Sequence, residues 1–155
     1  MSIIATEIQR GGAYSFFSVL TTYVINKKQF MFGQSKGKSK DNRNNYHFIQ
    51  EILQDGKLGN ETEQSNWPHY YDFVTILEDI DSDNKYLFCT SADDNVLSLF
   101  ELTVDGKTKH KLTEQYLKGD FKVLTPYLAH GKLFIYSQKE ASKDWQVISF
   151  DYISD

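Results

Sequence analysis

A threonine–glutamate pair recurs along this chain and is the most regular set of side chains that could bind a ligand. The pairs are Thr6-Glu7, Thr62-Glu63 and Thr113-Glu114, separated by 56 and 51 residues, and Gln64 and Gln115 follow the second and third pairs. Carboxylate and amide oxygens accept hydrogen bonds from hydroxyl groups. A site copied in every repeat would therefore suit a polyhydroxylated ligand such as a sugar.

Aromatic residues could supply the other half of such a site, because an aromatic ring stacks on the apolar face of a sugar ring. The candidates are Tyr14, Trp67, Tyr71 and Trp145. The alternative is a structural role, in which each Thr-Glu pair fixes a corner of a repeat through hydrogen bonds to backbone amides. The sequence leaves both interpretations open.

The other reactive side chains do not form a catalytic or metal-binding pattern. The histidines are His47, His69, His110 and His130, and they are scattered without the short spacing of metal ligands. Cys89 is the single cysteine and lies in an apolar run, so a buried, inert thiol is expected. We therefore predict that the protein is not an enzyme and holds no metal ion or other cofactor.

Composition predicts a single soluble, all-β domain over residues 1–155. The chain is 15% aromatic, and aromatic side chains favour the half-buried surface of a β-sheet. No segment approaches the roughly 20 apolar residues of a membrane-spanning helix. Residues 1–7 have neither the basic nor the apolar part of a signal peptide. We expect no membrane insertion, and a protein that is cytoplasmic or released without a classical signal.

The net charge of −4 indicates that nucleic acid is not the partner, because a general attraction to phosphate is missing. One basic stretch, from Lys36 to Arg43, lies in a polar segment without interleaved aromatic residues. We interpret it as a solvated loop. The expected partner is a glycan or a protein surface.

The Thr-Glu pairs belong to a longer repeat of about 50 residues. Asp55-Gly56 and Asp105-Gly106 lie 50 residues apart, while Lys28, Lys85 and Lys132 are separated by 57 and 47 residues. The longer first interval reflects a polar insertion in the first repeat. The repeats cover approximately residues 6–61, 62–112, and 113–155 together with 1–5.

Each repeat is predicted to contain four antiparallel strands. The first has mixed polarity, the second is continuously apolar as in residues 86–89, the third alternates as in residues 97–102, and the fourth is polar. The third repeat stops after its third strand. Residues 3–5 precede Thr6-Glu7 as Lys111-Leu112 precedes Thr113-Glu114, so we expect this N-terminal strand to complete the last repeat.

This pattern resembles the blades of β-propellers, in particular the small, repetitive lectin-type propellers called tachylectin-like. The resemblance implies a ring of blades and sugar-binding sites carried by the repeats. Three blades are fewer than the roughly four to eight that normally close a ring. Two chains could form one six-bladed ring, or the three repeats could form a β-trefoil. We expect a homodimer, because three blades leave two open apolar faces.

The predicted function is non-enzymatic carbohydrate binding, with weak lectin-like sites that gain avidity through repetition. The alternative is a protein-interaction module, such as a toxin-associated or inhibitor protein with one protein partner. The repeats diverge in a way that favours this alternative, since only the second carries Trp67-Pro68-His69. Repeated sugar sites would instead favour similar repeats.

Overall fold

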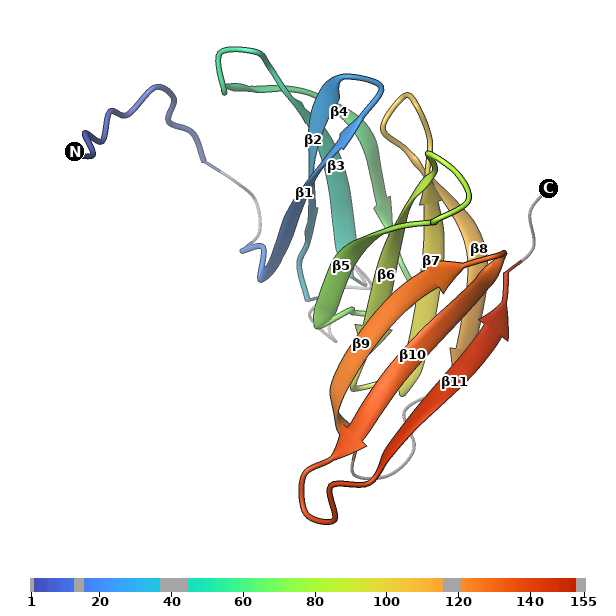
Figure 1. Cartoon of the computed structure of the whole chain (residues 1–155). Helices are drawn as coiled ribbons and strands as arrows, with labels where there is room; N and C mark the ends of the chain where they lie inside the picture. The colour runs from blue at the N-terminus through green and yellow to red at the C-terminus, as the bar shows by residue number, and fades with distance from the viewer. Residues whose placement is uncertain (1, 13–15, 37–44, 116–120, 153–155) are drawn as a thin grey trace.

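The computed structural model describes residues 2–12, 16–36, 45–115 and 121–152, and all regular elements in these ranges are β-strands (Figure 1). The prediction of an all-β chain is confirmed. No helix in the described ranges could cross a membrane. The strands are β1 (Val19–Ile25), β2 (Lys28–Gln34), β3 (Tyr46–Ile52), β4 (Leu58–Asn66), β5 (Phe73–Glu78), β6 (Lys85–Ser91), β7 (Val96–Leu102), β8 (Thr108–Gln115), β9 (Phe121–Ala129), β10 (Lys132–Lys139) and β11 (Trp145–Asp151).

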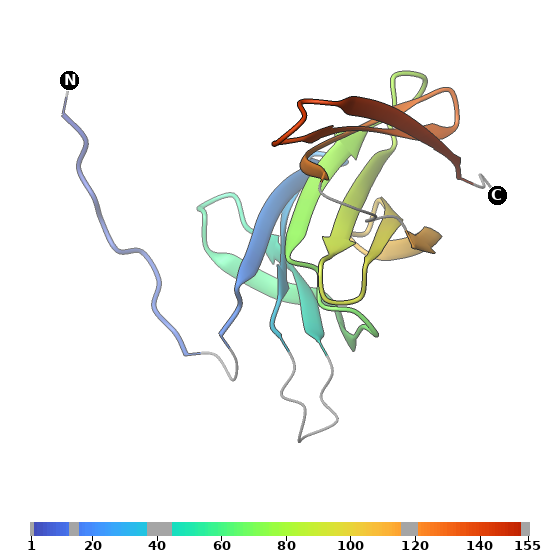
Figure 2. The same ribbon diagram turned by 90° about the horizontal axis from the view of Figure 1, so that it is seen from below.

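The strands form three antiparallel sheets, one per repeat. The first sheet has the order β1-β2-β3-β4, the second β5-β6-β7-β8, and the third β11-β10-β9. Each continuously apolar second strand lies between two neighbours, as the sequence predicts. Figures 1 and 2 show the sheets following one another face to face, with β5 between β1 and β9. A parallel bridge between Asp79 and Leu128 links the second and third sheets.

Residues that tolerate positive φ make the predicted turns. Asn26 (φ 48°) and Lys27 (φ 61°) form the two-residue connection between β1 and β2. This backbone conformation matches the twist of a hairpin, and asparagine adopts it at little cost. Gly56 (φ 83°) and Gly106 (φ 76°) occupy the same place in the β3–β4 and β7–β8 turns. The Asp-Gly turns expected from the sequence are therefore confirmed.

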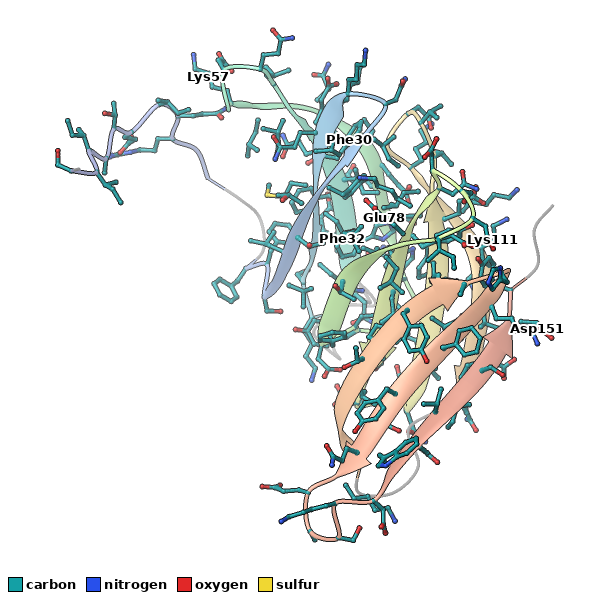
Figure 3. The ribbon with its side chains drawn as sticks, in the orientation of Figure 1. Phe30, Phe32, Lys57, Glu78, Lys111 and Asp151 are labelled. Atoms are coloured by element: carbon teal, nitrogen blue, oxygen red, sulfur yellow. The ribbon has the colours of Figure 1, made fainter. Side chains whose placement is uncertain are left out.

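The core consists of two apolar layers between successive sheets. The first layer joins the first and second sheets, and Figure 3 labels two of its members, Phe30 and Phe32. The second layer joins the second and third sheets and includes Phe88, Leu99 and Leu133. The second sheet is thus covered on both faces. The first and third sheets each have one face that no other described sheet covers.

Strand register identifies equivalent positions in the three sheets. Phe32 pairs with Ile49, Phe88 with Leu99, and Phe134 with Ser149. These phenylalanines are 56 and 46 residues apart, so the alignment on lysines at intervals of 57 and 47 is wrong by one residue. A shift of one residue moves a side chain to the opposite face of its sheet. In the corrected register, Phe32 and Phe88 lie on the face of their sheet that contacts the following sheet. Phe134 lies on the corresponding face of the third sheet, which points away from the second sheet.

The prediction that residues 3–5 complete the third sheet is wrong for this chain. Residues 2–12 form no strand, and the side chains of Ile3 and Ile4 are 97% and 86% exposed. The backbone N–H of Leu58 donates to Gln9 Oε1 over 2.7 Å, which links the segment to the start of β4. Figures 1 and 2 both show it on the opposite side of the molecule from β11.

Candidate binding surfaces

The structure brings Glu63, Trp67 and Tyr71 together around His47 and places the other described ligand-binding candidates elsewhere. Glu7 lies in the exposed segment before β1, where it forms an ion pair of 2.8 Å with Arg10. Glu63 and Gln64 lie on β4, Trp67 and Tyr71 follow it, Glu114 and Gln115 end β8, and Trp145 begins β11. Tyr14 lies outside the described residues. No single pocket is formed by the described members of this set.

Glu63 serves the junction between the first and second sheets. Its Oε1 lies 2.9 Å from Nε2 of the fully buried His47. The same oxygen accepts a hydrogen bond of 2.6 Å from the Thr108 hydroxyl, and Oε2 accepts a hydrogen bond of 2.6 Å from the Thr108 backbone N–H. Burial raises the pKa of Glu63, but the hydrogen bonds from His47 and Thr108 outweigh it and the net pKa is lowered. Here the Thr-Glu pair fixes a corner between repeats.

Trp67 and Tyr71 pack inside the molecule. The Trp67 ring lies parallel to Phe100, with centroids 4.4 Å apart and an interplanar angle of 2°, and its centroid is 3.9 Å from that of His47. Tyr71 is 2% exposed, and its hydroxyl lies 2.7 Å from the Ser98 hydroxyl. Burial raises the pKa of Tyr71 to about 12. Neighbouring side chains cover these two rings, which leaves them unsuited to stacking on a sugar.

Gln34 holds the segment that carries Trp67 and Tyr71, and sequence reasoning did not identify it. Its side chain is fully buried, its Nε2 donates to the His69 carbonyl over 2.9 Å, and its Oε1 accepts from the Tyr71 N–H over 2.9 Å. A glutamine at the end of an apolar strand was the available signal. A buried polar group is retained where it is hydrogen-bonded.

Aromatic side chains cover the face of the third sheet that points away from the second sheet. We call this surface the open aromatic face; it consists of Tyr127, Phe134, Tyr136, Trp145 and Val147. Tyr127 stacks on Phe134 with centroids 5.2 Å apart, and Tyr136 stacks on Trp145 at 6.0 Å. Trp145 is 64% exposed, Val147 45% and Tyr127 43%. Sequence reasoning named only Trp145.

The geometry of the open aromatic face suits a protein surface better than a sugar. Its rings stand in stacked pairs, so each ring has one face against its neighbour, with interplanar angles of 12° and 24°. Rings that lie flat and separate would present whole faces to a pyranose, whereas paired rings present edges and ridges between which apolar side chains can fit. Exposed apolar surfaces of this kind mark interaction sites.

An open pocket with a mixed polar and apolar lining lies between the first two sheets, at the ends of β1 and β5. It has a volume of about 330 Å³ and is lined by Val24, Ile25, Asn26, Glu78, Ser82, Asp83 and Lys85. The Lys85 ammonium forms an ion pair of 3.0 Å with Glu78, which Figure 3 labels. The carboxylates, the amide and the ammonium could hydrogen-bond a small polyhydroxylated molecule.

The corresponding place between the second and third sheets is bridged by side chains. His130 Nδ1 lies 2.8 Å from Asp81 Oδ2, and the Tyr152 hydroxyl donates to Asp79. These contacts join the turn after β5 to the third sheet. They occupy the position where the first junction has its pocket.

Within the described ranges, no group of three or more His, Cys, Asp or Glu side chains is arranged to hold a metal ion. Cys89 is fully buried, as predicted, and burial raises the pKa of its thiol well above the usual value. A thiol in this state is a poor nucleophile. Comparisons of the chain with models of protein families, with curated proteins and with solved structures found no match.

Proposed function

We propose that the protein is a non-enzymatic interaction module whose open aromatic face packs on the first sheet of a second copy. The observation that carries this proposal is the equivalence of Phe32, Phe88 and Phe134. Phe32 and Phe88 are fully buried beneath the next sheet, whereas Phe134 is only half-buried. The third sheet therefore has the pattern of a covered face without a covering sheet among the described residues.

The free face of the first sheet is the natural counterpart. Leu20 and Val24 on that face are 56% and 48% exposed, and Met31 between them is half-buried. The first sheet packs on the second and the second on the third, so the same succession continues from the third sheet to a first sheet. Each chain offers one face of each kind. Two chains then form two identical interfaces related by a two-fold axis.

This assembly is a ring of six blades, within the range of about four to eight that β-propellers use. The face-to-face succession of sheets and the neighbouring first strands β1, β5 and β9 support blades over a β-trefoil. Burying both free faces removes apolar surface from water, which favours association by about 25 cal/mol per Å² of apolar area. A closed ring also gives every blade a neighbour on each side.

Carbohydrate binding is the second candidate function, and the pocket between the first two sheets favours it. Glu78, Asp83 and Asn26 offer oxygen and nitrogen atoms to hydroxyl groups from two different sheets. A glycan array at high protein concentration tests this candidate, with Asp83→Asn as the variant that should weaken any signal. An array without signal for the unmodified protein would remove it.

Sedimentation equilibrium of two matched variants tests the proposed interface. Trp145→Ser removes the most exposed ring of the open aromatic face, and we expect the dimer dissociation constant to rise at least about tenfold, as for a central aromatic residue of an interface. Val104→Ser is the control, because Val104 is 69% exposed in the β7–β8 turn, away from that face. Equal dissociation constants for the Trp145→Ser variant and the unmodified protein would contradict the proposal.

A further inference from the structure

The segment before β1 lies beside the first sheet in the way that a fourth strand of one sheet lies beside the next sheet. The backbone N–H of Leu58, at the start of β4, donates to Gln9 Oε1 over 2.7 Å. One sheet further on, the backbone N–H of Thr108, at the start of β8, donates to Glu63 Oε2 over 2.6 Å. Glu63 belongs to β4, the fourth strand of the first sheet.

Strand pairing shows that these two contacts are equivalent. Leu58 pairs with Ile52 at the end of β3, and Thr108 pairs with Leu102 at the end of β7. The segment containing Gln9 therefore has the same relation to β4 as β4 has to β8. The Gln9 contact is therefore the one expected of a fourth strand that belongs to a sheet preceding the first sheet.

The order of the chain leads to the same placement. In both complete sheets the fourth strand precedes the first strand of the next sheet, as β4 precedes β5 and β8 precedes β9. Gln9 precedes Val19, the first residue of β1, by 10 residues, and Glu63 likewise precedes Phe73, the first residue of β5, by 10. The segment that leads into β1 should therefore be the fourth strand of the sheet before β1.

The third sheet has a free position for such a strand. Across the described residues, β11 pairs only with β10, so its outer edge presents backbone N–H and C=O groups to solvent. The segment of the same chain lies on the other side of the molecule, held by Gln9 (Figures 1 and 2). In the proposed ring, the sheet that precedes the first sheet is the third sheet of the second copy.

We propose that the segment of residues 2–12 of one copy pairs with β11 of the second copy and completes its third sheet. The inference rests on the proposed two-chain ring and adds to it an exchange of strands. It also accounts for Ile3 and Ile4, which are 97% and 86% exposed in the single chain and would lie at a sheet edge beside apolar side chains in the pair. Main-chain hydrogen bonds along β11 would give the added strand its affinity.

Photo-crosslinking between isotope-labelled copies tests the exchange. A benzophenone amino acid replaces Ile4, and equal amounts of ¹⁴N and ¹⁵N chains are unfolded together and refolded. We expect crosslinked peptides that join position 4 to β11, and roughly half of them should combine both isotopes because random pairing of two copies gives that share. The same probe at Val104 is the control and should not reach β11.

The exchange would be overturned if every crosslink to β11 contained a single isotope, or if crosslinks from position 4 fell only outside β11. A dimer that depends on Trp145 but gives either result would leave the two-chain ring intact. A chain that stays monomeric at every concentration would overturn the ring and the exchange together. Removing residues 2–8 should also raise the dimer dissociation constant at least about tenfold, since the main-chain contacts of the strand are lost.

Discussion

Phe88 in β6 and Phe134 in β10 hold the same position in neighbouring sheets but lie in different surroundings. Phe88 pairs with Leu99 and is fully buried under the third sheet. Phe134 pairs with Ser149, stacks on Tyr127 and is half-buried. The two sheets thus share one apolar pattern, and only the presence of a following sheet separates a core layer from an open surface. This difference is the basis for proposing that a second copy covers the third sheet.

The polar contacts at the sheet junctions support this comparison. Glu63 on β4 reaches Thr108 on β8, and Tyr152, after β11, reaches Asp79, after β5. Each contact joins a sheet to its neighbour. Gln9 makes the corresponding contact to Leu58 from the segment before β1. In the proposed ring, only the junction between a third and a first sheet needs a second chain.

The largest expected effect comes from removing the covered ring. Phe88→Ala leaves a cavity in the core and should lower the free energy of unfolding by about 3–5 kcal/mol. Phe134→Ala removes the equivalent ring from an open surface, and at dilutions that favour the monomer it should cost no more than about 1 kcal/mol. Urea denaturation measures the loss of unfolding free energy in each of the two variants. Similar losses would mean that the two faces are equally covered within one chain.

A smaller effect is expected from two equivalent glycines. A Cβ atom at Gly106 would lie 2.3 Å from the Phe30 ring of the first sheet, while one at Gly56 would meet only Ile8, at 3.5 Å. Both residues have positive φ, so alanine costs about 1 kcal/mol of backbone strain at each. Gly106→Ala should lose about 1–3 kcal/mol more from overpacking. Thermal unfolding should give a lower melting temperature for Gly106→Ala than for Gly56→Ala. Equal melting temperatures would contradict this prediction.

The smallest effect concerns pH and the Glu63 junction. Because the folded-state pKa of Glu63 is lowered, its carboxylate stabilises the fold above its ordinary pKa of 4.5, and this stabilisation is lost as the pH falls through the folded-state value. Glu63→Gln should cost about 1–2 kcal/mol at pH 7, where hydrogen bonds to a charged group are lost. The cost should shrink below pH 4.5. Urea titrations at several pH values should show the unfolding free energies of the Glu63→Gln variant and the unmodified protein converging as the pH falls. A difference that does not change with pH would mean that the cost has another cause.

Much of the fold could be predicted because strands and turns are encoded locally. The apolar run at residues 86–89 and the Asp-Gly pair at Gly106 specify a buried strand and a tight turn. The alignment of equivalent positions between the repeats could not be predicted from local patterns. The connection between β1 and β2 has two residues, whereas Asp79 to Asn84 separate β5 from β6. Lys28 and Lys85 are therefore not equivalent. Lys132 also follows a two-residue turn, but it precedes Phe134 by two residues whereas Lys28 precedes Phe32 by four.

The candidate surfaces were harder to predict, since they depend on contacts between distant residues. Trp67 lies in a polar stretch that indicates an exposed loop, yet the segment after β4 folds over the core and is held there by Gln34. The segment at residues 3–5 has the pattern of a strand, but Gln9 holds it beside the first sheet. In the single chain this segment forms no strand, so its local pattern predicted neither its conformation nor its location.

The mass of the unmodified protein in solution tests the central claim most directly. Light scattering over a wide range of concentrations should give a species of about 36 kDa, twice the 18.0 kDa of one chain, because the open aromatic face and the free face of the first sheet cover each other. Folded monomer should be scarce at working concentrations. A stable monomer of 18.0 kDa at high concentration would contradict the two-chain ring.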